Sequence, residues 1–147
     1  AGAWYAGNVD TEQFLQVDLG GPHTIRGVAT QGKSISSEVN RGSQHHVTSY
    51  AITTSLDGLE WVKQRCSSSS ANVAANSTKA TSVLDTSMVF SGNNDASTVV
   101  AHGFADVSVK ARYVRFMPLT WSGHIAMRVE VYGNQLGLPL VSGGTST

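Results

Sequence analysis

Residues 111–133 read ARYVRFMPLTWSGHIAMRVEVYG, and this stretch indicates the fold more clearly than any other. Two runs in it, 113–116 and 126–132, are rich in β-branched and aromatic residues, and a segment with proline and glycine joins them. Short runs of this composition, bounded by turn residues, predict β-strands. Working outward along the chain, further runs of the same kind lie at 14–19, 24–30, 47–55 and 97–100.

Turn-forming residues separate these predicted strands. Gly20-Gly-Pro22 predicts a turn after 14–19. Asp57-Gly58 predicts a tight hairpin with a return strand at 59–62. The one helix candidate, 71–84, is weakened by its Asn, Ser and Thr residues. Short, evenly spaced strands with turn chemistry between them predict an all-β sandwich or barrel.

Composition narrows the class of protein. The 147 residues fit one domain with a substantial core, since 40% of them are hydrophobic. Ten Lys+Arg balance ten Asp+Glu, and this zero net charge argues against a nucleic-acid binder, which needs a basic surface. No apolar run approaches the roughly 18–20 residues that cross a bilayer. No basic cluster predicts an electrostatic membrane tether either.

Residues 65–87 have a different composition from the strands. They are rich in Ser, Ala, Thr and Asn, with few large apolar side chains, and they predict a long surface loop. Within them Asn76 begins an Asn-Ser-Thr glycosylation sequon, which would matter only in a secreted protein. The single Cys66 cannot form an internal disulfide, so we expect an idle or interchain thiol.

Catalytic patterns are missing from the sequence. Asp10 and Glu12 stand two apart and are expected to be solvated on a β-surface rather than paired for acid–base chemistry. The neighbouring His45 and His46 would point to opposite sides of an extended chain and chelate one metal poorly, even with His124 nearby. We therefore predict a protein that is not an enzyme.

Five blocks of sequence form a pattern along most of the chain. They are WYAGNVDTEQFLQVDLG at 4–20, VATQG at 28–32, VTSYAITTSLDGLEW at 47–61, VFSGNNDASTVV at 89–100, and 111–133. Together they resemble the discoidin family, the coagulation factor 5/8 type C domain. The resemblance implies an all-β, eight-stranded antiparallel jelly-roll β-sandwich of the galactose-binding-domain-like type. It also implies a secreted, extracellular or cell-surface location, with binding loops projecting from one end.

The two ends of the chain depart from the family pattern. Residues 1–134 resemble the domain from its second binding loop onward, and Asn134 stands where the family has a closing cysteine. Residues 135–147 resemble the opening segment of such a domain. This tail could begin a second repeat, complete its own domain as a permuted strand, or enter a neighbouring copy. Because Leu136, Leu138, Leu140 and Val141 are too apolar to remain in water, we expect 136–143 to pack on a discoidin core, with a homo-oligomer or strand swap as one form of that packing.

The candidate ligand site is built from loops, because loops on a rigid sandwich usually carry recognition. Residues 31–46 are polar, and by resemblance they form the third binding loop, whose final His pair stands where relatives carry aromatics lining the ligand cleft. The alternative for this loop is a solvated connection. Trp4 and Trp121 could instead cap the core, and Trp61 is assigned to packing. The predicted ligand-binding residues are Trp4, Tyr5, Asn8, Asp10, Lys33, Ser36, Arg41, His45, His46, Trp121 and Gly123.

Three charged residues interrupt strand segments that are otherwise apolar, namely Asp18, Arg128 and Glu130. A buried charge must be paired, so we expect Arg128 to meet an acid such as Asp18. Some discoidin-like sugar-binding modules hold a structural calcium through backbone carbonyls and an acid near the last strand. That resemblance makes Glu130 a weak calcium candidate, and no other cofactor is expected.

Together these features predict a non-catalytic extracellular adhesion module that binds a glycan or a protein in a cleft between end loops. Membrane-binding relatives carry large apolar residues at their loop tips, whereas Ile35 and Val39 are the only aliphatic residues in 31–46. Two alternatives remain open: a self-associating structural repeat of a secreted adhesive or matrix protein, and a module that binds anionic phospholipid.

Overall fold

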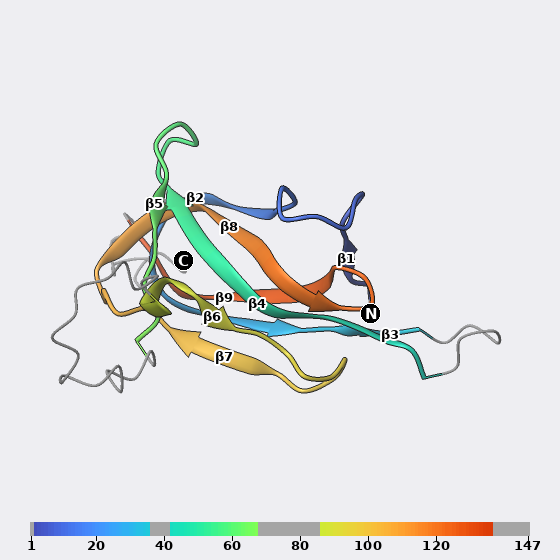
Figure 1. Cartoon of the computed structure of the whole chain (residues 1–147). Helices are drawn as coiled ribbons and strands as arrows, with labels where there is room; N and C mark the ends of the chain where they lie inside the picture. The colour runs from blue at the N-terminus through green and yellow to red at the C-terminus, as the bar shows by residue number, and fades with distance from the viewer. Residues whose placement is uncertain (1, 36–41, 68–85, 137–147) are drawn as a thin grey trace, which may run out of the picture.

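The computed structural model describes residues 2–35, 42–67 and 86–136, and all structural statements below concern these ranges (Figure 1). They form antiparallel strands and a single 3₁₀ turn, which confirms the predicted all-β class. The described ranges hold nine strands rather than the implied eight, and four of the nine have only two residues. The elements are β1 (Trp4–Tyr5), β2 (Leu15–Gln31), β3 (Lys33–Ser34), β4 (Gln44–Ser55), β5 (Val62–Lys63), η1 (Thr86–Met88), β6 (Phe90–Ser91), β7 (Val100–Gly103), β8 (Val109–Ser122) and β9 (Ala126–Gln135).

The strands follow the order β1-β9-β2-β8-β4-β3, with β5 and β6 added to β4 and β7 added to β2. The first part of β2 pairs with β8, and its second part pairs with β9 on one edge. β2 and β8 bend together around one end of the molecule, so the sheet closes on itself as two layers (Figure 1). No helix in the described ranges is long enough to span a membrane.

Aromatic rings fill the space between the layers. The Tyr50 ring centroid lies 5.5 Å from that of Phe90 and 5.9 Å from that of Phe116, and all three side chains are fully buried. Tyr50 and Phe116 come from the neighbouring strands β4 and β8, where alternate residues point inward. Aliphatic side chains surround the rings, among them Ile25, Val28, Val47, Ile52, Val114, Ile125 and Met127.

The sequence predicted that a strand ends at the turn Gly20-Gly-Pro22. This prediction is wrong, because β2 continues through these residues from Leu15 to Gln31. Gly20 has φ +80°, and the register against β8 shifts between Asp18 and His23. The extra residues of β2 form a bulge that bends the strand from one layer into the other. The glycine-rich segment therefore curves the strand without ending it.

Two predicted strand boundaries are also wrong, because side-chain caps hold turns there. The Asp57 carboxylate accepts hydrogen bonds from the backbone N–H groups of Leu59 (2.8 Å) and Glu60 (3.0 Å), so the return strand begins at Val62 and Leu59 is 83% exposed. In the same way Asp95 accepts from the backbone N–H of Ser97 (2.9 Å), and β7 begins only at Val100.

The expected pairing of Arg128 with Asp18 is wrong. Asp18 accepts two hydrogen bonds from Arg112, at 2.8 Å from Nε and 3.0 Å from Nη2. Asp18 lies beside β8 on the outer surface, whereas Arg128 lies on β9 opposite Gln31, at the far end of β2. Because β2 bends, Asp18 and Arg128, which the sequence predicted as a pair, lie in different parts of the sheet.

The Asp18 carboxyl gives a pH-dependent stability. Its pKa falls from 3.8 to about 2, chiefly because Arg112 donates to it and next because the Gly20 N–H does. The folded pKa lies below the unfolded one, so the charged form stabilises the fold above about pH 4 and this contribution is lost between pH 4 and pH 2. We expect Asp18→Asn to reduce the drop in melting temperature across this range relative to the wild type. The effect is modest because the pair is exposed. Identical pH profiles for the two proteins would contradict it.

The packing role predicted for Trp61 agrees with its contacts. Its ring centroid lies 3.7 Å from the Arg115 guanidinium carbon, and the Phe14 ring centroid lies 4.3 Å from the same carbon. The Trp61 Nε1–H donates to the Gly58 carbonyl oxygen at 3.2 Å. Arg115 thus joins the β4–β5 hairpin to the outer face of the sheet.

Candidate functional site

Several predicted site residues meet at one end of the sandwich, where β1 and β3 lie near the N-terminus (Figure 1). Backbone pairing sets this arrangement. Tyr5 in β1 is opposite Ala126 at the start of β9, and Lys33 in β3 is opposite His45 at the start of β4. His46 in turn is opposite Ser122 at the end of β8. Three separate parts of the chain therefore converge.

Three rings form the centre of this end, and we call Tyr5, His45 and His124 the ring cluster. Ring centroids are separated by 6.2 Å for Tyr5–His45, 5.8 Å for Tyr5–His124 and 6.1 Å for His45–His124. Tyr5 is 41% exposed, and the two imidazoles are half-buried. The cluster presents aromatic faces together with polar ring atoms at the surface.

Gly123 allows His45 to approach the turn between β8 and β9. A Cβ added at Gly123 would lie 2.5 Å from Cδ2 of His45, and the glycine has φ +70°. Any larger residue would clash and would be strained in this left-handed conformation. The predicted site residue Gly123 is therefore a positioning residue for the ring cluster.

The two candidate tryptophans pack mainly against the core, the alternative that the sequence left open. Trp4 is opposite Met127 and Trp121 is opposite Val47, and both side chains are half-buried against the core cluster. Trp4 also lines a cavity of about 420 Å³ with Leu15 of β2 and with Met127, Arg128 and Val129 of β9. Trp4 directly precedes Tyr5 of the ring cluster in the sequence, and Trp121 stands two residues before Gly123.

Other predicted residues have different positions. His46 is only 8% exposed, so its side chain belongs to the interior and not to the binding surface. Asn8 is exposed, whereas the Asp10 carboxylate accepts from the Glu12 backbone N–H and from Gln13 Nε2, both at 2.9 Å. Asp10 thus caps its own loop. Ser36, Arg41 and Asn76 lie outside the described residues.

The predicted ligand-binding set omitted His124. It follows Gly123 directly, and a histidine after a Trp-Ser-Gly turn was the signal in the sequence. Its contact with His45 depends on the pairing of β4 with β8, which a linear pattern does not reveal.

Arg128 holds two neighbouring segments in place at this end of the sandwich. Its Nε donates to the Gly32 carbonyl oxygen at 2.8 Å, and its Nη2 donates to that of Ala96 at 2.7 Å. Asn93 connects two further segments, because its side-chain amide donates to the carbonyl oxygens of Thr30 (3.0 Å) and Thr98 (2.8 Å). The charge-assisted bonds of Arg128 hold Gly32, between β2 and β3, against β9.

The same contacts bear on the expected calcium. Glu130 is exposed on β9, and the described ranges contain no group of three or more His, Cys, Asp or Glu side chains that could hold a metal ion. The Gly32 and Ala96 carbonyl oxygens accept from Arg128. A calcium ion held with the help of Glu130 stays a prediction.

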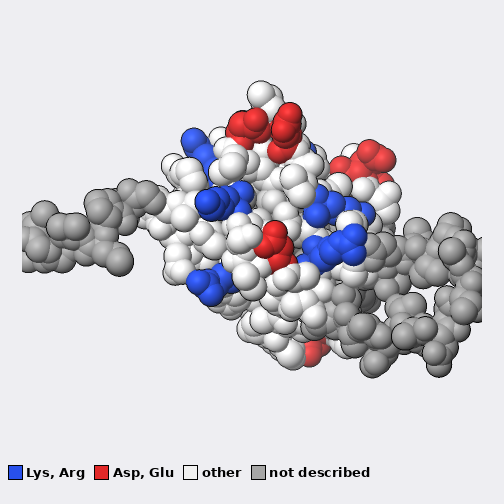
Figure 2. Space-filling view, turned by 90° about the vertical axis from the view of Figure 1, so that its left-hand side faces the viewer, with Lys and Arg blue, Asp and Glu red and all other residues white. Residues whose placement is uncertain are grey.

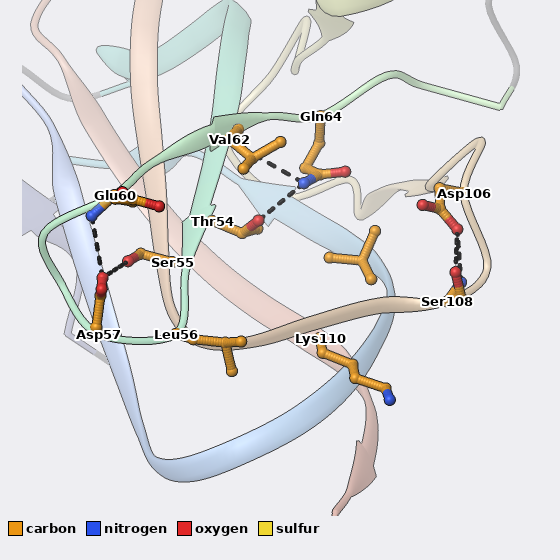
Figure 3. A pocket seen from close by; sticks show the side chains of 11 residues that line it. Thr54, Ser55, Leu56, Asp57, Glu60, Val62, Gln64, Asp106, Ser108 and Lys110 are labelled. Atoms are coloured by element: carbon orange, nitrogen blue, oxygen red, sulfur yellow. Dashed lines mark hydrogen bonds between the residues drawn. The ribbon is translucent and has the colours of Figure 1, made fainter.

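A second cavity, of about 380 Å³, lies between the β4–β5 hairpin and the start of β8 (Figure 3). Asp57 and Asp106 line it, but each carboxylate is bound within its own turn. Backbone N–H groups hold the pKa of Asp57 below the ordinary value, and the Ser108 hydroxyl followed by the Ser108 N–H does so for Asp106. Gln64 Nε2 is likewise bound to Thr54 Oγ1 at 2.8 Å. Since these polar groups serve the local structure, the ring cluster is the better candidate site.

Charge is dispersed over the end of the molecule where β2 and β8 bend. Figure 2 shows basic and acidic side chains mixed on that face, with uncharged surface between them. This view offers no broad patch of one sign, in keeping with the zero net charge.

A curved antiparallel sandwich with loops gathered at one end is an architecture that binding modules often use, and the family follows from comparison. The F5/8 type C domain model matches residues 1–131, and the chain belongs to this family. It is 35% identical over 130 residues to a polypeptide of discoidin-1 from Dictyostelium discoideum, covering 88% of this chain and 40% of that protein. It is 31% identical over 130 residues to neuropilin-1 of Xenopus laevis, covering 88% of this chain and 12% of that protein.

Among solved structures, recombinant discoidin II of Dictyostelium discoideum superposes with a TM-score of 0.66 at 21% identity, covering 92% of this chain and 42% of that one. This likeness confirms the discoidin-like sandwich. The chain spans less than half the length of each of these relatives.

Proposed function

We propose that this chain is a non-catalytic extracellular module that binds a ligand at the ring cluster, with a glycan as the favoured ligand and a protein as the second candidate. The observation that carries the proposal is the convergence of Tyr5, His45 and His124 from three segments within 6.2 Å of one another. Aromatic faces beside a few convergent polar atoms are the usual composition of small-ligand sites.

A sugar ring suits this composition because it has an apolar C–H face and a polar rim. The Tyr5 ring offers a face for the former, and the imidazole nitrogens offer donors or acceptors for hydroxyl groups. His45 Nδ1 is buried without a hydrogen-bond partner in the described part of the chain. Leaving such an atom unpaired costs about 1–3 kcal/mol, but a surface ligand cannot reach it, so a ligand would use the other ring nitrogens of the two histidines.

The absence of catalysis is part of the proposal. No hydrogen bond within the described ranges joins His45 or His124 to a carboxylate or to a hydroxyl nucleophile, and His124 Nδ1 contacts only the Ile125 carbonyl oxygen at 3.2 Å. A histidine that acts as a base needs a nucleophile and an orienting partner within hydrogen-bond reach.

Parallel binding assays test the proposal. The purified chain should bind a defined set of structures on a glycan array and should not bind liposomes of phosphatidylcholine with or without phosphatidylserine. Binding to phosphatidylserine liposomes alone would support the phospholipid alternative. Self-association without binding to either would support the structural-repeat alternative, and both of these outcomes contradict a glycan site.

A further inference from the structure

One strand edge in the sandwich has no neighbour. Residues Leu15 to Asp18 of β2 pair with β8 on one side, and no described residue pairs with them on the other. On this part of β2 the inward side chains Leu15, Val17 and Leu19 are only half-buried, although they pack against the core. Edges of this kind readily accept a further strand.

The chain continues toward this edge. In the pairing of β9 with β2, Ile25 is opposite Gly133 and His23 is opposite Gln135. The next residue keeps the same direction, because the Leu136 backbone N–H donates to the Pro22 carbonyl oxygen at 2.9 Å. Residues after 136 therefore start beside Pro22, where the unpaired part of β2 begins.

We propose that residues 138–142 of this same chain add to β2 as an edge strand and cover Leu15 and Val17. Residues 137–147 lie outside the described ranges, and they would reach about 36 Å at roughly 3.3 Å per residue. Five residues of β2 need only about 17 Å. The tail is long enough without any further segment.

The tail sequence fits an edge strand. Leu136, Leu138 and Leu140 alternate with Gly137 and Pro139, which gives one apolar face with the two-residue period of a strand. Successive backbone N–H groups point to opposite edges of a strand. Since that of Leu136 points toward β2, the N atom of Pro139 would face solvent, where proline is tolerated.

The bend of β2 supplies the register. Against β8, the bend leaves three residues of β2 without a partner between Asp18 and His23. With the same offset after the Leu136–Pro22 contact, Leu138 becomes opposite Val17 and Leu140 becomes opposite Leu15. Opposed residues of an antiparallel pair share a face, so both leucines would cover the half-buried side of β2.

Disulfide trapping in the full chain tests this register. In a Cys66→Ala background, we expect Val17→Cys with Leu138→Cys to form a disulfide within one monomer under mild oxidation. The matched control, Gln16→Cys with Leu138→Cys, places its cysteines on opposite faces and should not cross-link. A disulfide-linked dimer would overturn the proposal in favour of exchange between copies. No cross-link, or equal cross-linking in both pairs, would overturn it as well.

Hydrogen exchange gives a second readout that needs no new cysteine. In the unaltered chain, the amides of 15–18 that point away from β8 should exchange slowly. Leu138→Asp with Leu140→Asp should speed their exchange at least tenfold, whereas the control Thr145→Asp should leave it unchanged. Rapid exchange at 15–18 in the unaltered chain would show an open edge and overturn the proposal.

Discussion

Replacing Phe116 with Ala should lower the free energy of unfolding by about 3–5 kcal/mol, one of the two largest effects that the structure predicts. The Phe116 side chain is fully buried in the middle of β8, and its ring lies 5.9 Å from that of Tyr50 across to β4. Removing the ring leaves a cavity between the two layers of the sandwich. The curved strands hold these layers apart, so the neighbouring side chains can fill the cavity only partly. Urea denaturation followed by fluorescence measures the change.

Phe14→Ala is the matched control for this result. The same aromatic group is lost, but Phe14 is largely exposed and contacts Arg115 on the outer face. We expect a cost of about 1 kcal/mol or less, the scale of an exposed cation–π contact. Equal losses for the two variants would show that the core is not where the structure places it.

Gly133→Ala should destabilise the fold by about 3 kcal/mol, at the upper end of the range for overpacking. A Cβ at Gly133 would overlap the carbonyl oxygen of Thr24 and would lie 3.1 Å from the Ile25 Cα, all of which is backbone. No side chain can turn away to make room, so β9 would have to separate from β2. Thermal melting by circular dichroism detects the loss.

The control for this second variant is Gly7→Ala. Nothing lies within 4 Å of a Cβ added there, so the melting temperature should stay within about a degree or rise slightly as the unfolded chain loses freedom. If Gly133→Ala melted like Gly7→Ala, the close pairing of β9 with β2 would be contradicted.

The long strands could be predicted in part because their inward residues alternate. Residues 47–55 lie almost wholly within β4, and 113–116 and 126–132 lie within β8 and β9. The remainder of β8 escaped prediction because Pro118 interrupts its pattern, and the structure accommodates it where the β4–β8 register shifts beside Tyr50. The two-residue strands β1 and β3 are too short to produce any period.

The site was predictable only as a set of loops. Tyr5 and His45 were identified from residue type and position, whereas His124 and the true partner of Asp18 depend on which strands pair and in which register. A local pattern carries no information on such long-range pairing. His46 was predicted to line the site, but its side chain is buried and so is that of its neighbour Val47, so alternation alone did not reveal its position.

The most direct test of the binding site compares two tyrosines of equal exposure. Tyr5 is 41% exposed in the ring cluster, and Tyr132 is 42% exposed on β9. With the best glycan from the array as ligand, titration calorimetry should show at least a tenfold loss of affinity, or about 1.4 kcal/mol, for Tyr5→Ala and for His45→Ala. Tyr132→Ala should bind like the wild type, and all three variants should melt normally. Unchanged binding by Tyr5→Ala, or an equal loss in Tyr132→Ala, would contradict a ligand site at the ring cluster.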